Sequence, residues 1–255
     1  MPVSKRKVII VTGSSSGIGA VVARIAAERG YNVLVNYNSN RAGADAVVAD
    51  CKARGAEAIA VCANVAEDSD CRKLATAASE TWGRIDVLVN NAGTTKLCAH
   101  SDLEGLDAGD FQRIYAVNTI GAFQMIRAVV PVMKQTGGAI VNVASVAGLI
   151  GAGTSLAYAC SKAALLAINK SMARNLGPEI RVNAVCPGFV EGEWLQGLLG
   201  ADTYAAVKGH YEGRASTGRV MTPETVAENI WFFADGAPNV TGEHLLMDGG
   251  ATLPY

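Results

Sequence analysis

The sequence predicts an α/β fold with a doubly wound parallel sheet of about seven strands and helices on both faces. Short apolar runs rich in valine and isoleucine recur along the 255 residues. They are continuous rather than alternating, which is typical of strands covered on both faces. The runs are residues 8–11, 33–35, 58–61, 87–89, 140–143, 182–185 and 245–247. Segments of helical periodicity lie between them, and this alternation indicates parallel strands joined by right-handed crossovers.

Helices are predicted between these strands. After the first strand, five apolar residues have the spacing of one helical face: Ile18, Val21, Val22, Ile25 and Ala26. Gly30 then supplies a stop signal. Residues 111–133 and 155–176 are predicted as long helices that are apolar over much of their surface. Because no linker or repeat divides the chain, we expect one domain over residues 1–255, with the glycine-rich segment 188–221 as a mobile lid over a substrate site.

The composition excludes several classes of protein. Half of the residues are hydrophobic and 18% are charged, which argues against disorder. The net charge of −1 comes from 22 basic and 23 acidic residues. Nucleic-acid binders and polybasic membrane binders need a basic excess, so we expect neither partner.

The cysteines and histidines form no metal-binding pattern. The six cysteines contain no CxxC pair and the three histidines form no HExxH motif, so no metal is expected. We expect reduced thiols and a cytoplasmic protein without a signal peptide. The uncharged stretch 135–161 is rich in polar residues and glycine, which favours a buried strand, loop and helix over a transmembrane segment.

A glycine-rich turn, TGSSSGIG at residues 12–19, joins the first strand to the first helix. Gly13 permits the tight turn, Gly17 lets the backbone approach a pyrophosphate, and Gly19 lets the helix pack closely on the sheet. The helix N-terminus offers free N–H groups for phosphates. The spacing is not that of an ATP-type P-loop, and the strand–turn–helix context favours a dinucleotide site over a merely structural turn.

The end of the second strand bears on the choice of dinucleotide. Sites that prefer NAD usually place an acid there for the ribose 2′-hydroxyl. In the run 36–41 (NYNSNR) there is no acid, and Asn38, Ser39 and Arg41 are compatible with a 2′-phosphate. NADP(H) is therefore favoured, and NAD(H) stays possible because Arg41 could simply begin the next helix on a solvated face.

The segment YACSK at residues 158–162 carries the chemistry. Tyr158 and Lys162 are four residues apart and so share one helix face. An ammonium beside a phenol stabilises the phenolate, so we expect Lys162 to lower the pKa of Tyr158 and make it an acid or base near neutral pH. Ser145 follows the buried strand 140–143 and is expected in the same pocket.

These motifs, in this order, resemble those of the short-chain dehydrogenases/reductases along nearly the whole chain. The matching elements are TGSSSGIG (12–19), NNAG (90–93), Asn118, Ser145, YACSK (158–162), PG (187–188) and DGG (248–250). The resemblance implies a Rossmann-type domain, a nicotinamide cofactor and a homotetramer or homodimer. It also implies a ketone and a secondary alcohol as the small-molecule substrates.

The resemblance also implies residue roles. Tyr158 would be the general acid or base, Ser145 would hydrogen-bond the carbonyl oxygen, and Lys162 would lower the Tyr158 pKa and bind the nicotinamide ribose. Asn118 would help to hold a water in the proton relay. With the turn and loop residues above, the predicted cofactor-binding set is Gly13, Ser15, Gly17, Ile18, Gly19, Asn38, Ser39, Arg41, Asn64, Val65, Asn91, Ala92, Gly93, Tyr158, Lys162, Pro187, Gly188 and Val190.

Two positions depart from the pattern of the family. Asn64 stands where many members have aspartate near the adenine, and we expect a mild effect. Gly192 stands where the family often has a threonine whose hydroxyl contacts the cofactor, so that contact is lost or replaced.

Two alternative functions stay open. One, within the enzyme class, is a 3-oxoacyl-carrier-protein reductase, because the chain resembles those reductases and the glucose-dehydrogenase-like members. Arg127 and Lys134 are the only basic residues in the segment where a carrier would dock. The other is a catalytically silent nucleotide-sensing or interaction protein on the same fold, although such proteins usually lose the tyrosine or the lysine.

Overall fold

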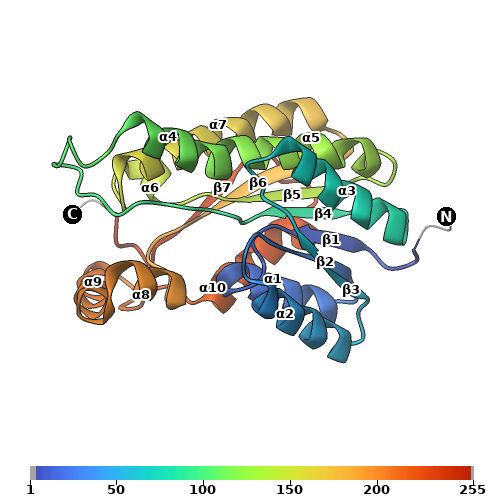
Figure 1. Ribbon diagram of the computed structural model, residues 1–255, viewed down its shortest axis with the longest axis horizontal. Coiled ribbons are helices and arrows are strands. Elements are labelled where there is room, and N and C mark those ends of the chain that lie inside the picture. The colour runs from blue at the N-terminus through green and yellow to red at the C-terminus, as the bar shows by residue number, and fades with distance from the viewer. Residues whose placement is uncertain (1–3, 254–255) are drawn as a thin grey trace.

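One seven-stranded sheet forms the centre of the molecule (Figure 1). The computed structural model describes residues 4–253. All neighbouring strands are parallel, in the order β3-β2-β1-β4-β5-β6-β7. The strands are β1 (Val8–Val11), β2 (Asn32–Tyr37), β3 (Ala58–Cys62), β4 (Val87–Asn90), β5 (Gly138–Val143), β6 (Ile180–Pro187) and β7 (His244–Met247). The predicted doubly wound sheet is confirmed, and every predicted apolar run lies inside a strand.

Helices cover both faces of the sheet (Figure 1). One face carries α1 (Gly17–Glu28), α2 (Arg41–Ala53) and α10 (Pro223–Trp231), and the other carries α3 (Asp68–Trp82), α5 (Ala122–Met133) and α7 (Leu156–Leu176). The remaining helical segments are α4 (Ala108–Tyr115), α6 (Ala147–Ile150), α8 (Glu193–Leu199), α9 (Ala201–Arg214) and the π-helical turns η1 (Ala116–Gly121) and η2 (Phe232–Gly236). Alternate residues of β1 face the two cores, with Ile9 in one and Ile10 in the other. Burial on both faces explains why the strands read as continuous apolar runs.

Helix α1 buries a slightly different face from the predicted one. Of the five predicted positions, Val22 and Ala26 are fully buried, while the other three are only partly buried. Ala23 completes the buried face, because α1 packs against both α2 and α10 and small side chains allow the close approach. Gly30 follows the helix with a φ of +81°, as the stop signal predicted.

The order of the strands creates a crevice. The chain leaves β1 for one side of the sheet and returns to β4 on its other side, so the loops after β1 and β4 diverge at the carboxyl edge. Helices α8 and α9 lie beyond that edge, at the lower left of Figure 1. Both occur between β6 and α10, and neither contains a fully buried residue.

The uncharged stretch 135–161 forms β5, the short helix α6 and the start of α7. Among the described helices, one continuous run, Ala108–Met133, is long and apolar enough to cross a membrane by length and composition alone. It comprises α4, η1 and α5, and half of its most apolar window is buried inside the protein, as in a core helix.

Candidate active site

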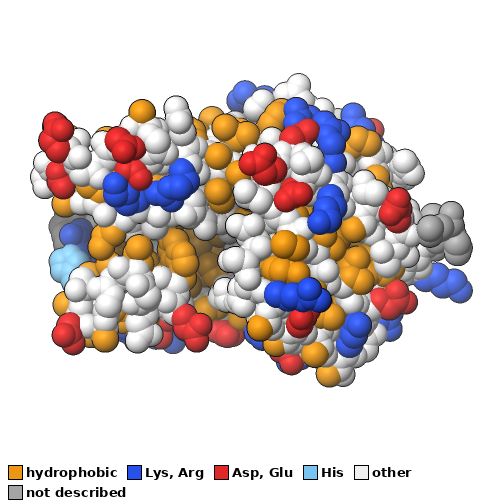
Figure 2. All heavy atoms as spheres, in the orientation of Figure 1, with side chains coloured by type: hydrophobic (Ala, Val, Ile, Leu, Met, Phe, Trp, Pro, Cys, Tyr) orange, Lys and Arg blue, Asp and Glu red, His pale blue; other side chains and the backbone are white. Residues whose placement is uncertain are grey.

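A cavity of about 700 Å³ opens at the carboxyl edge of the sheet. Figure 2 shows it as a hollow between the body of the molecule and the part at lower left that contains α8 and α9. Its walls come from the loops after β1, β2, β3, β4, β5 and β6 and from the start of α8. Segments far apart in the sequence therefore meet at the crevice that the strand order predicts.

The glycine-rich turn forms one wall and is held by side-chain amides. Gly13 N–H donates to Asn36 Oδ1 over 2.9 Å, and Asn91 Nδ2 donates to the carbonyl of Gly13 over 3.0 Å. A Cβ on Gly13 would lie 2.9 Å from Ala92 Cα, and one on Gly19 would lie 2.6 Å from Asn91 Nδ2. Glycine is therefore required for the packing of the turn against the segment after β4.

The start of α1 fits the phosphates of a dinucleotide. Ser16, the residue that precedes the helix, makes no capping hydrogen bond with its side chain. The first N–H groups of α1 thus keep their capacity for a negatively charged ligand. Gly17 and Ile18 line the cavity here, and a Cβ on Gly17 would meet no atom within 4 Å, so the backbone is open to a ligand.

The end of β2 lines the cavity with neutral residues. Asn38 and Ser39 lie on its wall, whereas Arg41 does not. The Arg41 side chain is 78% exposed and pairs with Asp45 over 3.5 Å, on the outer surface of α2. The structure thus brings Asn38 and Ser39 into the candidate site and leaves Arg41 outside it.

Ser145, Tyr158 and Lys162 line the same cavity. The Ser145 hydroxyl lies near the phenol of Tyr158, accepts from Ala147 N–H over 3.1 Å and donates to the carbonyl of Pro187 over 3.5 Å. Lys162 Nζ donates to the carbonyl of Val143 over 2.7 Å and lies 5.7 Å from the centre of the Tyr158 ring. Strand β5 and helix α7 thus present a hydroxyl, a phenol and an amine to one space.

Burial is the main cause of the shifted pKa values of Tyr158 and Lys162. It raises the pKa of the Tyr158 phenol to about 12, and the hydrogen bond with Ser145 offsets only part of the rise. It lowers the pKa of the Lys162 ammonium to about 8. In the chain by itself desolvation sets the direction of the Tyr158 pKa, and the lowering of that pKa by Lys162 stays a prediction.

Asn118 lies beside the cavity rather than on its wall. It is buried in the π-helical turn η1, where its Oδ1 accepts from Thr94 N–H over 2.8 Å. Its Nδ2 donates to the carbonyl of Thr94 over 2.9 Å and to Ser161 Oγ over 3.0 Å. The side chain therefore connects the segment after β4 to α7, and both of its N–H groups bond the protein.

The rest of the predicted set falls mostly in the cavity wall. The residues placed there are Ser15, Asn64, Val65, Asn91, Ala92, Gly93, Pro187, Gly188 and Val190. Gly19 is packed beneath the turn and does not reach the wall. Asn64 Oδ1 accepts from Ala66 N–H over 3.1 Å, which orders the loop after β3.

Sequence reasoning missed several wall residues. Arg113 comes from α4 and Val117 from η1, and Pro223 begins α10. The position of Val117 beside Asn118 was the one available signal. Nothing local marks Arg113 or Pro223, because only the packing of distant helices brings them to the crevice.

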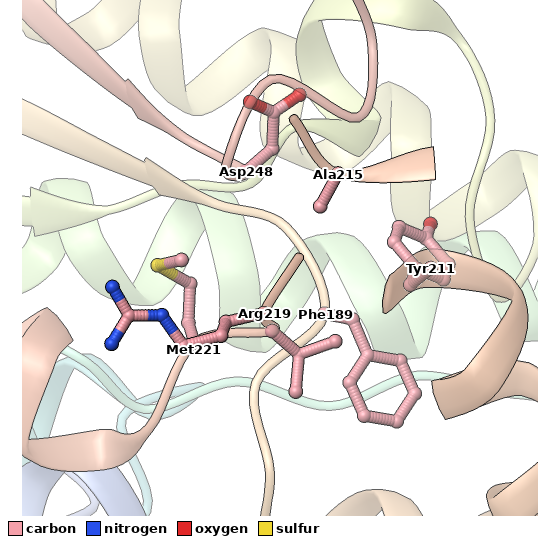
Figure 3. A pocket seen from close by; sticks show the side chains of 7 residues that line it. Phe189, Tyr211, Ala215, Arg219, Met221 and Asp248 are labelled. Carbon is pink, nitrogen blue, oxygen red and sulfur yellow. The ribbon is translucent and has the colours of Figure 1, made fainter. Parts of the chain in front are cut away.

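A second, smaller hollow lies where α9 meets the end of β6 (Figure 3). Phe189, Tyr211, Met221 and Asp248 are among the residues that surround it, and they leave no volume for a ligand. The Phe189 ring lies 5.5 Å from that of Tyr211 and 5.4 Å from that of Tyr204. This hollow is therefore a packing junction, formed mostly within the segment 188–221.

The fold and the cavity define a dinucleotide-binding oxidoreductase. A family model described as enoyl-(acyl carrier protein) reductase matches residues 13–252. The chain is 40% identical over 247 residues to a protein of Streptomyces violaceoruber named as ketoacyl reductase 2 of the granaticin polyketide synthase, with 96% of each chain covered. It is 37% identical over 253 residues to a 3-oxoacyl-[acyl-carrier-protein] reductase of Synechocystis, with 97% of each covered.

Solved structures agree with these relatives. A short-chain dehydrogenase/reductase from Burkholderia xenovorans superposes with a TM-score of 0.91 at 38% identity, over 98% of this chain and 100% of that one. An NAD⁺-bound xylitol dehydrogenase superposes with a TM-score of 0.87 at 29% identity, over 96% and 98%. The chain belongs to the short-chain dehydrogenase/reductase family. It is an oxidoreductase that interconverts a ketone and a secondary alcohol with a nicotinamide cofactor.

Proposed function

We propose that the protein is a ketone reductase that prefers NADP(H) and uses Tyr158 as its general acid. The observation that carries this proposal is the meeting of Ser145, Tyr158 and Lys162 in the cavity that the glycine-rich turn also lines. A phenol whose pKa is about 12 keeps its proton at neutral pH. That protonation state suits donation to a carbonyl oxygen, which is the direction of reduction.

Each side chain has one task in this mechanism. A reduced nicotinamide, held by the glycine-rich turn and Lys162, would supply the hydride for the carbonyl carbon. Ser145 donates a hydrogen bond to the carbonyl oxygen and holds it beside Tyr158. Tyr158 transfers its phenolic proton to that oxygen, which gives the alcohol and leaves a phenolate. Lys162 in its ammonium form stabilises the phenolate until a proton from solvent restores the phenol.

The preference for NADP(H) rests on the absence of an acid from the part of the cavity wall near β2. Asn38 and Ser39 offer hydrogen-bonding groups there, and neither would repel a 2′-phosphate. Arg41 reaches such a phosphate only by leaving Asp45, and an exposed pair of this kind costs less than about 1 kcal/mol to break. NAD(H) is the weaker alternative.

The segment 188–221 acts as a lid in this proposal. Its two ends are joined by a parallel bridge between Val190 and Met221, and Glu191 N–H donates to the carbonyl of Met221 over 2.8 Å. Helices α8 and α9 form the excursion between these ends and bury no residue fully. Because the two ends of the segment are held together, α8 and α9 can move relative to the sheet as one unit.

We also infer a homo-oligomer and a cytoplasmic location. Ile120 and Phe123 are 48% and 38% exposed on the helix that continues from η1 into α5. Exposed apolar side chains on neighbouring turns fit a helix that packs against a second copy. All six cysteines are free thiols, as expected in a reducing compartment.

Replacing Tyr158 with phenylalanine tests the function. We expect Tyr158→Phe to lose at least about a hundredfold in turnover, because general acid catalysis contributes on this scale, while NADPH still binds. Tyr115→Phe is the matched control, since Tyr115 lies on α4 outside the cavity wall. Ketone reduction followed by NADPH absorbance, with a fluorescence titration of NADPH, gives both readouts. Full turnover by Tyr158→Phe would refute the assignment.

A 3-oxoacyl-carrier-protein reductase is the second candidate, favoured by the names of four relatives. A carrier protein needs a basic docking face beside the site. Arg127, one of the two basic residues expected there, is paired with Asp68 on α3 and lies over the Phe123 ring. A carrier-bound substrate that is reduced much faster than the free ketone would favour this candidate.

A further inference from the structure

Five large apolar side chains are exposed on segments that also carry residues of the cavity wall, and we call them the apolar rim. They are Leu97 (50% exposed), Leu149 (37%), Ile150 (50%), Leu156 (40%) and Trp194 (53%). Trp194 lines the cavity itself, from the start of α8, and shares it with Ser145 and Tyr158. Figure 2 shows hydrophobic side chains inside and around this hollow. Single exposed apolar residues are ordinary, but a group of them beside a site marks a binding surface.

Hydrogen bonds and close packing hold the rim next to the reacting groups. Cys98 N–H donates to the carbonyl of Thr154 over 2.9 Å, which fixes the loop carrying Leu97 against the turn before α7. A Cβ on Gly148 would lie 2.6 Å from the carbonyl carbon of Lys162, so α6 packs directly on the catalytic helix. The rim is thus built on the elements that position the candidate catalytic residues.

The charges of the cavity disfavour an anionic substrate. Apart from the lysine beside Tyr158, the charged residues of the wall are Arg113, Glu191 and Glu193. Arg113 is paired with Asp110 over 3.2 Å, and Glu191 is paired with Lys208 over 3.1 Å. Glu193 has no ion-pair partner within residues 4–253. A substrate carboxylate or phosphate would therefore meet an unpaired acid and, apart from Lys162, no unpaired cation.

We propose that the apolar rim binds the apolar substituent of a neutral ketone, with Trp194 as its main contact. This inference rests on the proposed function, since the ketone must reach Tyr158. Substrate binding removes the rim from water, so each methylene that the rim covers strengthens binding. A neutral hydrocarbon substituent also avoids repulsion by Glu193.

A series of methyl ketones of increasing chain length tests the inference. We expect kcat/KM of the wild type to rise about two- to fourfold per added methylene, until the substituent extends past the rim. In Trp194→Ala the increase of kcat/KM per methylene is reduced. Most of the loss of kcat/KM for the longer ketones appears as a higher KM. At equal length, an oxo-carboxylate is reduced more slowly than the methyl ketone, and Glu193→Gln narrows that difference.

Phe232→Ala is the control, because Phe232 is also an exposed aromatic residue (49%) but lies on η2, outside the cavity wall. It should keep the chain-length dependence of the wild type. An active Trp194→Ala variant with the full dependence would overturn this inference alone. A Trp194→Ala variant with an altered oligomeric state and an unaltered substrate preference would also overturn it. The apolar rim would then be a contact between two copies of the chain. A wild type that binds NADPH but reduces no ketone would overturn the proposed function as well.

Discussion

The side-chain amide of Asn142 donates a hydrogen bond to the side-chain oxygen of Asn169 over 3.0 Å, in the buried layer between β5 and α7. Asn142 Oδ1 in turn accepts from Asn90 Nδ2 of β4 over 3.0 Å. Asn169 lies two helical turns after Lys162 and so on the same face of α7. This chain of amides therefore fixes how α7 sits on the sheet, and with it the positions of Tyr158 and Lys162 relative to Ser145.

Replacing Asn169 with leucine should weaken both stability and catalysis. The buried amide of Asn142 would lose its acceptor, which costs about 1–3 kcal/mol of the free energy of unfolding. We expect kcat to fall while the affinity for NADPH changes little, because the glycine-rich turn is untouched. Asn175→Leu, on the exposed end of the same helix, is the control and should change neither. Urea denaturation and steady-state kinetics decide this, and an unchanged midpoint in Asn169→Leu would contradict the role of the amide chain.

The buried lysine predicts a rise of stability in alkaline solution. The pKa of Lys162 is about 8 in the folded chain against 10.5 ordinarily, so between these values the unfolded chain binds more protons. Stability should therefore increase with pH over this window, by about 3 kcal/mol relative to Lys162→Met when complete. Above pH 10 the raised pKa of Tyr158 acts in the opposite direction, because there the folded chain keeps the phenolic proton.

Denaturation midpoints of the wild type and of Lys162→Met at pH 7 to 10 measure this effect. Their difference isolates Lys162 from other groups that titrate in the same range. A difference that does not change with pH would mean that the ammonium is better solvated than its burial indicates.

An acid at position 38 should reverse the preference for NADP(H). Asn38→Asp places a carboxylate on the cavity wall near β2, where it repels a 2′-phosphate and can accept from a 2′-hydroxyl. We expect the NADPH dissociation constant to rise about tenfold, while NADH binding is unchanged or tighter. Asn175→Asp adds the same charge outside the cavity and should leave both constants unchanged. Equal weakening of both cofactors in Asn38→Asp would instead indicate a distorted loop.

Alanine at Gly13 should weaken cofactor binding by crowding the turn. Gly13 has a φ of +61°, and its new Cβ would lie 2.9 Å from the backbone of Ala92. Gly30→Ala is a matched control, because Gly30 also has a positive φ but a Cβ there meets nothing within 4 Å. Both variants carry the cost of the backbone conformation, about 1 kcal/mol, and only Gly13→Ala has to move the segment after β4. Calorimetry with NADPH should show weakened binding in Gly13→Ala alone, and equal binding in the two variants would contradict the close approach.

The sequence by itself determined the sheet, its parallel strands and the family, because these depend on local patterns. Continuous apolar runs such as 140–143 report strands buried on both faces, and the glycine spacing of 12–19 reports a turn that only small residues can form. Tertiary structure alone decided that Arg41 points away from the cavity, that the Asn118 amide bonds Thr94 and Ser161, and that Arg113 reaches the cavity wall. It also decided the direction of the Tyr158 pKa, since desolvation depends on every segment packed around the phenol. Periodicity is a property of neighbours along the chain, whereas burial and side-chain pairing depend on segments that only the folded chain brings together.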